Sequence, residues 1–227
     1  MPSISLITLT KDNPADFEAC FLSFVTGSDS FFSEVIVSDA SEKDEVKALA
    51  RRYSLTHLCS QPGRGAQLAA GAAQAAGEWI LFLHSDTQLV DGWQQALAKH
   101  VDSTPHRAAV FRLAFNAPSF GARLVAGWAN FRTRLFGLPY GDQGLFISNQ
   151  LYQEIGGFDP HLPLMEDVDI VRKLGRERLR LLSARAVTSA EKYKKDGWFK
   201  RSLRHFKFFF LYQSGKSVRD IYQDYYR

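Results

Sequence analysis

The segment WILFLHSD at residues 79–86 decides the fold class. Its five apolar residues, 79–83, are typical of a short strand in the middle of a parallel sheet, where helices cover both faces. The run ends abruptly in the polar residues His84, Ser85 and Asp86. We therefore expect a buried central strand that carries an imidazole and a carboxylate to the edge of a sheet.

Strand and helix signals alternate on both sides of this segment. Further strands are expected at 5–10, 34–38, 55–59, 108–115 and 145–148. Helices are expected to begin at Asn13 and after Ser41, and to cover 65–76, 92–101, 120–136 and 166–174. Alternation of this kind predicts an α/β fold with a mainly parallel central sheet that is flanked by helices.

The composition fits a globular protein. A chain of 227 residues with 45% hydrophobic residues suits one large domain, or one core with a small appendage. The two cysteines, Cys20 and Cys59, stand in apolar surroundings without a metal-site or disulfide spacing, so we expect both to be buried, reduced thiols. The longest apolar run near the end, 208–212, is far below the ~20 residues that cross a bilayer. These features predict a cytoplasmic protein.

The last part of the chain differs in character from the rest. We expect a main domain at 1–190 and a basic, aromatic helical tail at 191–227. Six cations between residues 192 and 204 accompany a single acid, Asp196. Such a cluster can contact phosphates, anionic lipid or nucleic acid, or can form a solvated helix face. No nucleic-acid recognition motif accompanies it, so we expect no nucleic-acid partner.

Apolar residues recur at helical spacing within this tail. They are Phe199, Leu203, Phe206 and Phe210. Two interpretations stay open. The residues pack on the core, or residues 194–212 form an interfacial helix at the inner membrane face.

Acids at the predicted strand ends are candidate ligand contacts, because open parallel sheets bind ligands beyond the carboxyl ends of their strands. Asp39 follows the second strand and Asp86 follows the apolar one. His84 and Asp86 are two residues apart and would point the same way on an extended chain. A divalent cation that bridges phosphates needs only one or two protein carboxylates. The alternative for each acid is a structural cap on the next helix.

A third acidic cluster, EDVD at 166–169, opens a predicted helix just after Pro163. Acids in a first helical turn are favoured by the helix dipole, which gives a structural explanation. The functional interpretation is that one acid caps the helix while another faces a cleft as a general base.

These motifs, in this order, resemble inverting glycosyltransferases of family 2, which have the nucleotide-diphospho-sugar transferase (GT-A) fold. The matching segments are 8–10 (TLT), 37–39 (VSD), 64–71 (RGAQLAAG), 82–86 (FLHSD), 156–159 (GGFD) and 166–167 (ED). The likeness extends over nearly the whole chain. A narrower resemblance, at 84–87, 137–144 and 162–168, is to a bacterial subgroup named for its association with arsenosugar biosynthesis or with radical-SAM and selenodomain neighbours.

The resemblance implies roles for the donor site. Asp39 would hydrogen-bond the nucleotide base, Thr10 would line the same pocket, and Arg64 would lie near the nucleotide or its phosphates. Asp86 matches the last Asp of the family's Asp-x-Asp motif, the usual ligand to Mn²⁺ or Mg²⁺. His84 stands where the first Asp of that motif is usual, and imidazole can ligate a metal or hydrogen-bond a ribose.

The resemblance also implies the catalytic groups. Asp167 matches the general base that deprotonates the acceptor hydroxyl, and Glu166 would support it. Asp142 and Gln143 lie in the loop that builds the sugar and acceptor pocket. The expected reaction is metal-dependent transfer from a nucleotide-diphospho-sugar, by default a UDP-sugar, to a small-molecule or lipid-linked hydroxyl acceptor. The Gln-x-x-Arg-Trp motif of processive synthases is absent, so we expect non-processive transfer.

Three other functions remain as alternatives. A non-catalytic nucleotide-sugar binding protein would have lost activity through the change at His84. A nucleotidyltransferase would share the fold, but its usual glycine-rich loop after the first strand is missing at 11–14. A dinucleotide-dependent oxidoreductase would use the glycines at 63 and 65, but Leu68 occupies the third glycine position of that fingerprint.

Overall fold

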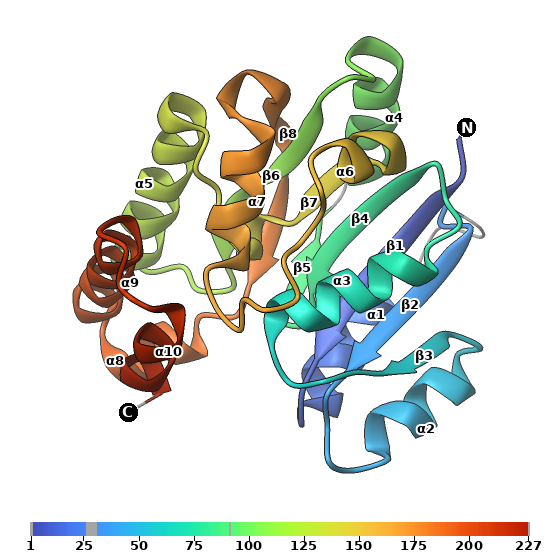
Figure 1. The fold of residues 1–227 in the computed structure, drawn as a ribbon, viewed down its shortest axis with the longest axis horizontal. Coiled ribbons are helices and arrows are strands. Elements are labelled where there is room, and N and C mark those ends of the chain that lie inside the picture. The colour runs from blue at the N-terminus through green and yellow to red at the C-terminus, as the bar shows by residue number, and fades with distance from the viewer. Residues whose placement is uncertain (1, 26–30, 91, 227) are drawn as a thin grey trace.

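The computed structural model describes residues 2–25, 31–90 and 92–226. The strands among them form one eight-stranded sheet in the order β3-β2-β1-β4-β7-β6-β8-β5 (Figure 1). These strands are β1 Ile4–Thr10, β2 Glu34–Asp39, β3 Thr56–Cys59, β4 Trp79–His84, β5 Thr87–Leu89, β6 Ala108–Phe115, β7 Leu145–Ser148 and β8 Leu179–Thr188.

Helices lie on both faces of the sheet (Figure 1). They are α1 Pro14–Val25, α2 Glu45–Arg52, α3 Arg64–Gln74, α4 Trp93–Ser103, α5 Phe120–Phe136, α6 Asn149–Glu154, α7 Glu166–Leu174, α8 Glu191–Asp196, α9 Trp198–Gln213 and α10 Val218–Tyr226. Two short 3-10 helices, η1 Gly141–Gln143 and η2 Arg176–Arg178, interrupt the connecting loops.

The central strand β4 is buried along its whole length, as its apolar run predicts. Its side chains alternate between two core clusters. Ile80 and Phe82 pack with residues of α3 and α7 on one face, whereas Leu81 and Leu83 pack with residues of α1 and α4 on the other. Burial on both faces explains why the strand is a continuous apolar run instead of an alternating one.

The order of the strands fixes where a ligand can bind. β1 pairs in parallel with both β2 and β4, so the chain runs outward through β2 and β3 and then returns to the other side of β1. The carboxyl ends of β1 and β4 therefore meet at a topological switch point, the usual binding edge of an open α/β sheet. β7 is antiparallel to β4 and β6, and β6 pairs in parallel with β8. The predicted mainly parallel sheet is confirmed.

Helix α3 packs closely on the sheet because it is built from small residues. A Cβ added at Gly71 would lie 2.6 Å from Cγ2 of Ile7 in β1. A Cβ at Gly65 would lie 2.5 Å from the carbonyl oxygen of Leu162 and would also collide with the carbonyl of Asp159. Gly65 thus serves close packing against the loop before α7, which accounts for one of the two glycines that suggested a dinucleotide fingerprint.

Two features differ from the sequence-based expectations. Strand β8 was not predicted, because Arg180 and Arg185 interrupt its apolar pattern and a register irregularity interrupts its pairing with β6.

The two cysteines differ in their exposure to solvent. Cys20 is buried, as expected, and its thiol donates to the carbonyl of Thr87 at 2.9 Å. The prediction that Cys59 is buried was wrong: it lies on β3, the outermost strand at one side of the sheet, and is exposed.

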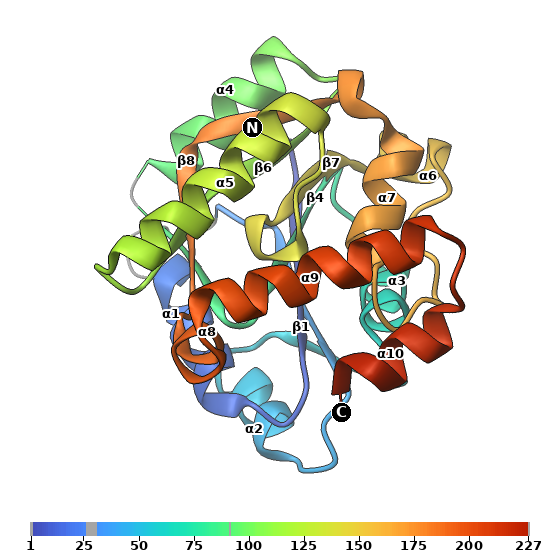
Figure 2. The same cartoon turned by 90° about the vertical axis from the view of Figure 1, so that its left-hand side faces the viewer.

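The C-terminal helices cross one side of the molecule, with α9 running below α5 in Figure 2. Trp198 holds α9 against α5, where a Cβ on Gly121 would lie 2.7 Å from the indole. Phe208 is buried in a cluster with Leu164 and Ile221. The four apolar residues at helical spacing in the tail are instead 48–72% exposed, so the core-packing interpretation is wrong for them. The division of the chain at residue 190 stays a prediction.

Candidate active site

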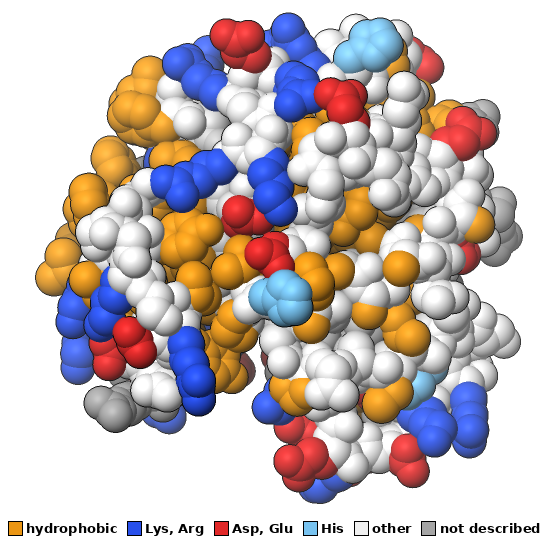
Figure 3. Space-filling view, viewed as in Figure 1, with side chains coloured by type: hydrophobic (Ala, Val, Ile, Leu, Met, Phe, Trp, Pro, Cys, Tyr) orange, Lys and Arg blue, Asp and Glu red, His pale blue; other side chains and the backbone are white. Residues whose placement is uncertain are grey.

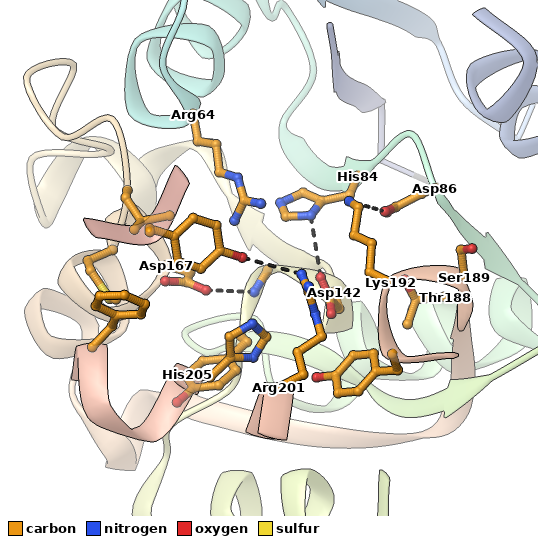
Figure 4. Close-up of a pocket in the computed structure, with 17 residues that line it drawn as sticks. Arg64, His84, Asp86, Asp142, Asp167, Thr188, Ser189, Lys192, Arg201 and His205 are labelled. Carbon is orange, nitrogen blue, oxygen red and sulfur yellow. Dashed lines mark hydrogen bonds and ion pairs between the residues drawn. The ribbon is translucent and has the colours of Figure 1, made fainter. Parts of the chain in front are cut away.

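A cavity of about 90 Å³ lies at the carboxyl end of β4. Its walls come from the loop around η1, the start of α7 and the C-terminal helices (Figure 4). Five predicted site residues line it together: Arg64, His84, Asp86, Asp142 and Asp167. Residues up to about 100 positions apart in the chain therefore converge at the edge that the strand order selects.

His84 ends β4 and points at the loop that carries Asp142. The imidazole Nδ1 lies 3.6 Å from Oδ1 of Asp142. The loop can approach this closely because residue 141 is glycine, and a Cβ there would lie 2.5 Å from Cε1 of the His84 ring. Burial acts to raise the pKa of Asp142, but the hydrogen bond and charge of His84, helped by Arg64, outweigh it and hold that pKa below its usual range. Asp142 is therefore a carboxylate at neutral pH.

Asp86 follows β4 by two residues. The chain leaves the extended conformation at Ser85, yet His84 and Asp86 still line the same cavity. The Asp86 carboxylate lies 3.4 Å from Nζ of Lys192, which comes from α8 (Figure 4). A partly exposed ion pair of this kind is weak, so either partner can exchange it for a ligand.

The residues at this point fit a divalent cation held jointly with a ligand. No cluster of three or more His, Cys, Asp or Glu side chains suited to a metal occurs within the described ranges. Asp86 and His84 nevertheless offer one carboxylate and one imidazole on the same wall. Mg²⁺ and similar ions in phosphate sites use one or two carboxylates and take their remaining ligands from phosphates and water.

The first turn of α7 carries two adjacent acids in opposite environments. Asp167 faces the cavity, and its Oδ2 accepts a hydrogen bond from the Gly141 backbone N–H at 2.9 Å. Glu166 is 1% exposed, and its carboxylate oxygens have no hydrogen-bond partner within the described chain. Burial, and then the charge of Asp167, raise the pKa of Glu166 to about 7. Nη1 of Arg64 lies 3.9 Å from Glu166 and partly opposes this shift.

The C-terminal helices form one wall of the cavity, and the sequence predicted only its basic residues. Lys192 and Arg201 belong to the basic cluster that suggested phosphate contact, and both line the cavity. Arg201 donates to Asp196 at 2.6 Å. His205 and Tyr140 also line the cavity and were not predicted as site residues, although Tyr140 lies two residues before Asp142 in the segment 137–144. Burial, and then the charge of Arg201, lower the pKa of His205 to about 4, so this imidazole is neutral at pH 7.

Two predicted donor-site residues lie outside the cavity lining. Thr10 and Asp39 are paired in register at the carboxyl ends of β1 and β2, and they are 1% and 4% exposed. Asp39 lies 3.0 Å from Nε2 of His57 and also accepts from the backbone N–H of Ser41. These contacts give Asp39 a structural role at the strand end, next to the switch point.

Gln143, predicted for the sugar and acceptor pocket, is fully buried in η1. Its amide donates to the carbonyl of Phe111 at 3.0 Å and accepts from the hydroxyl of Thr133 at 2.8 Å. Gln143 thus ties the loop that carries Gly141 and Asp142 to β6 and α5, and does not itself reach the cavity lining.

The geometry can be compared with known proteins. The model of glycosyl transferase family 2 matches residues 5–148, which run from β1 to the end of β7. The chain belongs to glycosyl transferase family 2. The matched region of this family 2 chain includes Thr10, Asp39, Arg64, His84, Asp86, Asp142 and Gln143.

Solved glycosyltransferase structures share the fold of this family 2 chain. The structure of GalNAc-T7 with UDP, GalNAc and Mn²⁺ superposes with a TM-score of 0.64 at 14% identity, covering 83% of this chain and 44% of the other. Residues 1–349 of TarS from S. aureus superpose with a TM-score of 0.62 at 16% identity, covering 89% and 63%. This chain thus spans less than two thirds of either one. No curated protein was found to match it.

These likenesses confirm the GT-A type of α/β fold that the motifs predicted. The narrower bacterial subgroup stays a prediction.

Proposed function

We propose that this family 2 chain is a metal-dependent, inverting glycosyltransferase. It would transfer a sugar from a nucleotide-diphospho-sugar, first of all a UDP-sugar, to the hydroxyl of a small-molecule or lipid-linked acceptor, without processivity and in the cytoplasm. The observation that carries the proposal is a cavity at the switch-point edge, lined by Asp86 and His84, by the carboxylate of Asp167 and by the cations Arg64, Lys192 and Arg201. TarS with UDP or UDP-GlcNAc and GalNAc-T7 with UDP and Mn²⁺ have the same fold.

The donor diphosphate would lie among the cations of the cavity. Arg64, Lys192 and Arg201 come from α3, α8 and α9 and would oppose the charge that develops on the leaving group. Asp86, with His84 beside it, would hold Mn²⁺ or Mg²⁺, and such an ion supplies further neutralisation of the diphosphate when bound. Lys192 would then give up its contact with Asp86 and turn to the phosphates.

The remaining donor contacts follow from positions next to the cavity. Thr10 and Asp39 would receive the nucleotide base at the ends of β1 and β2. Asp142 would face the sugar, and Gln143 would contribute by fixing the loop that carries Asp142.

Asp167 would act as the general base. The Gly141 N–H fixes one of its carboxylate oxygens, so the group is held in one orientation toward the cavity. It would take the proton of the acceptor hydroxyl as that oxygen attacks the anomeric carbon and the bond to the diphosphate breaks. A single displacement inverts the anomeric configuration. Glu166 would support the base from behind, because its raised pKa limits the negative charge beside Asp167 near neutral pH.

A thermal-shift and calorimetric screen tests this proposal. Nucleoside diphosphates and nucleotide-sugars are added with and without Mn²⁺, because a ligand that binds only the folded state raises its apparent stability. We expect a manganese-dependent shift with one nucleotide, absent in Asp86→Ala. The matched control is Asp102→Ala, which removes an exposed acid from α4. A wild-type protein that responds to no nucleotide, or an Asp86→Ala variant with the full metal-dependent shift, would contradict the proposal and favour a non-catalytic protein.

A further inference from the structure

A second concave region lies between α5 and the strands β6 and β8. This groove has a volume of about 1050 Å³ and shares no lining residue with the candidate active site. Five arginines line it: Arg107, Arg112, Arg134, Arg176 and Arg180. A neighbouring hollow of about 450 Å³, which shares Arg112 with the groove, adds Arg123 and Arg185. Among the described residues that line these two hollows, the acids are limited to Glu177. We call the two hollows together the arginine groove.

No acid among the described residues pairs with the guanidinium groups of the arginine groove. In the described part of the chain, none of the seven makes a side-chain hydrogen bond or an ion pair, whereas Arg178, close by on η2, pairs with Glu154 at 2.7 Å. Seven like charges around one groove repel one another. Because guanidinium binds phosphate oxygens with two parallel hydrogen bonds, a ligand rich in phosphates would relieve this repulsion.

An exposed apolar stripe runs along α5 beside the arginine groove. Its members are Phe120, Leu124, Trp128, Phe131 and Leu135, which are 40–74% exposed. Their spacing of three or four residues places them on one face of the helix. Phe131 also lines the groove, where Arg134 is its neighbour. The stripe and the arginines therefore border each other.

Helix α9 extends this apolar surface. It contacts α5 at Gly121, and it exposes Phe199, Leu203, Phe206 and Phe210. Figure 2 shows α5 and α9 on the same face of the molecule, and hydrophobic side chains gather along the corresponding edge in Figure 3. A continuous apolar area of this kind is unusual for a surface that faces only water.

The charges of the two helices select the partner. The exposed basic residues of the two helices are Arg123 and Arg134 in α5 and Lys200 and Lys207 in α9, and neither helix contains an Asp or Glu. A second copy of the chain on this face would bring cationic helices together, and an uncharged partner would leave the groove unneutralised. A bilayer with anionic lipids matches both features, because apolar side chains enter the headgroup region while arginines contact phosphates.

We propose that α5, α9 and the arginine groove together form a docking surface for an anionic phospholipid bilayer. This surface is larger than the contact expected for residues 194–212, because it adds the stripe of α5 and the arginines of β6 and β8. The proposal does not depend on the chemistry of the cavity.

Co-sedimentation of the full chain with vesicles tests the surface. Vesicles contain phosphatidylcholine alone or with one quarter phosphatidylglycerol, at low and at high salt. We expect binding to the anionic vesicles at low salt only. Because each basic residue near an anionic membrane contributes roughly fivefold in affinity, Arg112→Gln/Arg180→Gln should weaken binding about 25-fold. The matched control, Lys43→Gln/Arg51→Gln, removes the same charge from exposed positions at α2, at the other end of the molecule (Figure 1).

Trp128 reports on the apolar part of the surface, since it is 51% exposed on the stripe. Lipids brominated in their acyl chains should quench part of the tryptophan emission of the wild type. Trp128→Phe should lose that quenching and still sediment with the vesicles.

Three results would overturn the proposal: no binding of the wild type to anionic vesicles at low salt, equal weakening by both double variants, or tight binding of inorganic polyphosphate that anionic vesicles do not displace. If Arg112→Gln/Arg180→Gln does not fold, Arg134→Gln on α5 takes its place. The nucleotide-dependent thermal shift is measured on every variant, so a failure of the docking surface is distinguished from a failure of the donor site.

Discussion

The active-site cavity and the arginine groove are both concave and both rich in cations, but they balance charge in opposite ways. In the cavity, His84 faces Asp142, Lys192 contacts Asp86, and Arg201 contacts the nearby Asp196. In the groove, the seven arginines have no acidic partner within the described residues. Paired charges at short range can be exchanged one by one for the groups of a small ligand. Unpaired charges of one sign instead require a partner that is itself a polyanion.

The cavity and the groove also differ in how far their charged groups are exposed to solvent. The cavity is covered by the C-terminal helices, and the fully buried carboxyl group of Glu166 lies directly behind the lining residue Asp167. Charges there act in a medium of low polarity, where small displacements change reactivity. Most of the groove arginines are open to solvent, where salt screens them strongly. The first region is thus suited to chemistry and the second to reversible attachment.

The largest expected effect is in the cavity, at Asp167. Asp167→Asn keeps the size of the side chain but removes the proposed base, so turnover should fall about 10²–10⁴-fold while donor affinity changes little. Steady-state kinetics and calorimetry measure the two quantities. The control is Asp169→Asn on the same helix, which loses an ion pair with Lys173 and should keep its turnover. Unchanged turnover in Asp167→Asn would remove this residue from the role.

The next effect distinguishes a buried acid beside the cavity, Glu166, from the exposed acid of the groove, Glu177. The pKa of Glu166 is raised from 4.5 to about 7, so the folded state binds this proton more tightly than the unfolded state. The stabilisation is complete below the unfolded pKa and is lost as pH rises from about 4.5 to 7, by about 3 kcal/mol. The lowered pKa of His205 changes the unfolding free energy in the opposite direction over nearly the same pH range. The contribution of Glu166 is therefore measured as a difference: in urea unfolding, the stability of the wild type relative to Glu166→Gln should fall by this amount as pH rises from about 4.5 to 7.

Glu177→Gln in the arginine groove is the control for this measurement, since Glu177 is exposed. It should keep the wild-type dependence of unfolding free energy on pH. If Glu166→Gln kept it as well, the pH dependence would come from other groups, and the contrast between the buried and exposed acids would lose its support.

The smallest effect concerns the imidazole at the end of β4. His84→Asp restores the usual Asp-x-Asp pattern and would replace the proposed nitrogen ligand by a hard oxygen ligand. We expect donor binding to shift about tenfold in favour of Mg²⁺ over Mn²⁺. Titration of the nucleotide-dependent thermal shift with each metal measures the ratio. An unchanged ratio would indicate that His84 holds the loop through Asp142 and does not contact the ion.

Local sequence patterns were sufficient to predict the central strand and several of the helices and strands around it. The apolar run before His84 predicted a strand buried on both faces, because complete apolarity is advantageous only where neither side meets water. The predicted bounds of the helix at 120–136 and of the strand at 108–115 agree with the structure. The positions of Asp86 and Asp167 next to element ends followed from the same periodicity, and both line the cavity.

Contacts between distant segments decided the rest. Local sequence does not predict that His205 lines the cavity, because the packing of α9 through Trp198 and Phe208 brings this wall to the strand ends. Strand β8 forms through its pairing with β6, which compensates for a weak local pattern. The arginine groove arises only when β6, β8 and α5 are assembled, since its charges are scattered over about 80 positions of the chain. Periodicity reports which side of one element is buried, but only the packing of elements determines which charges become neighbours.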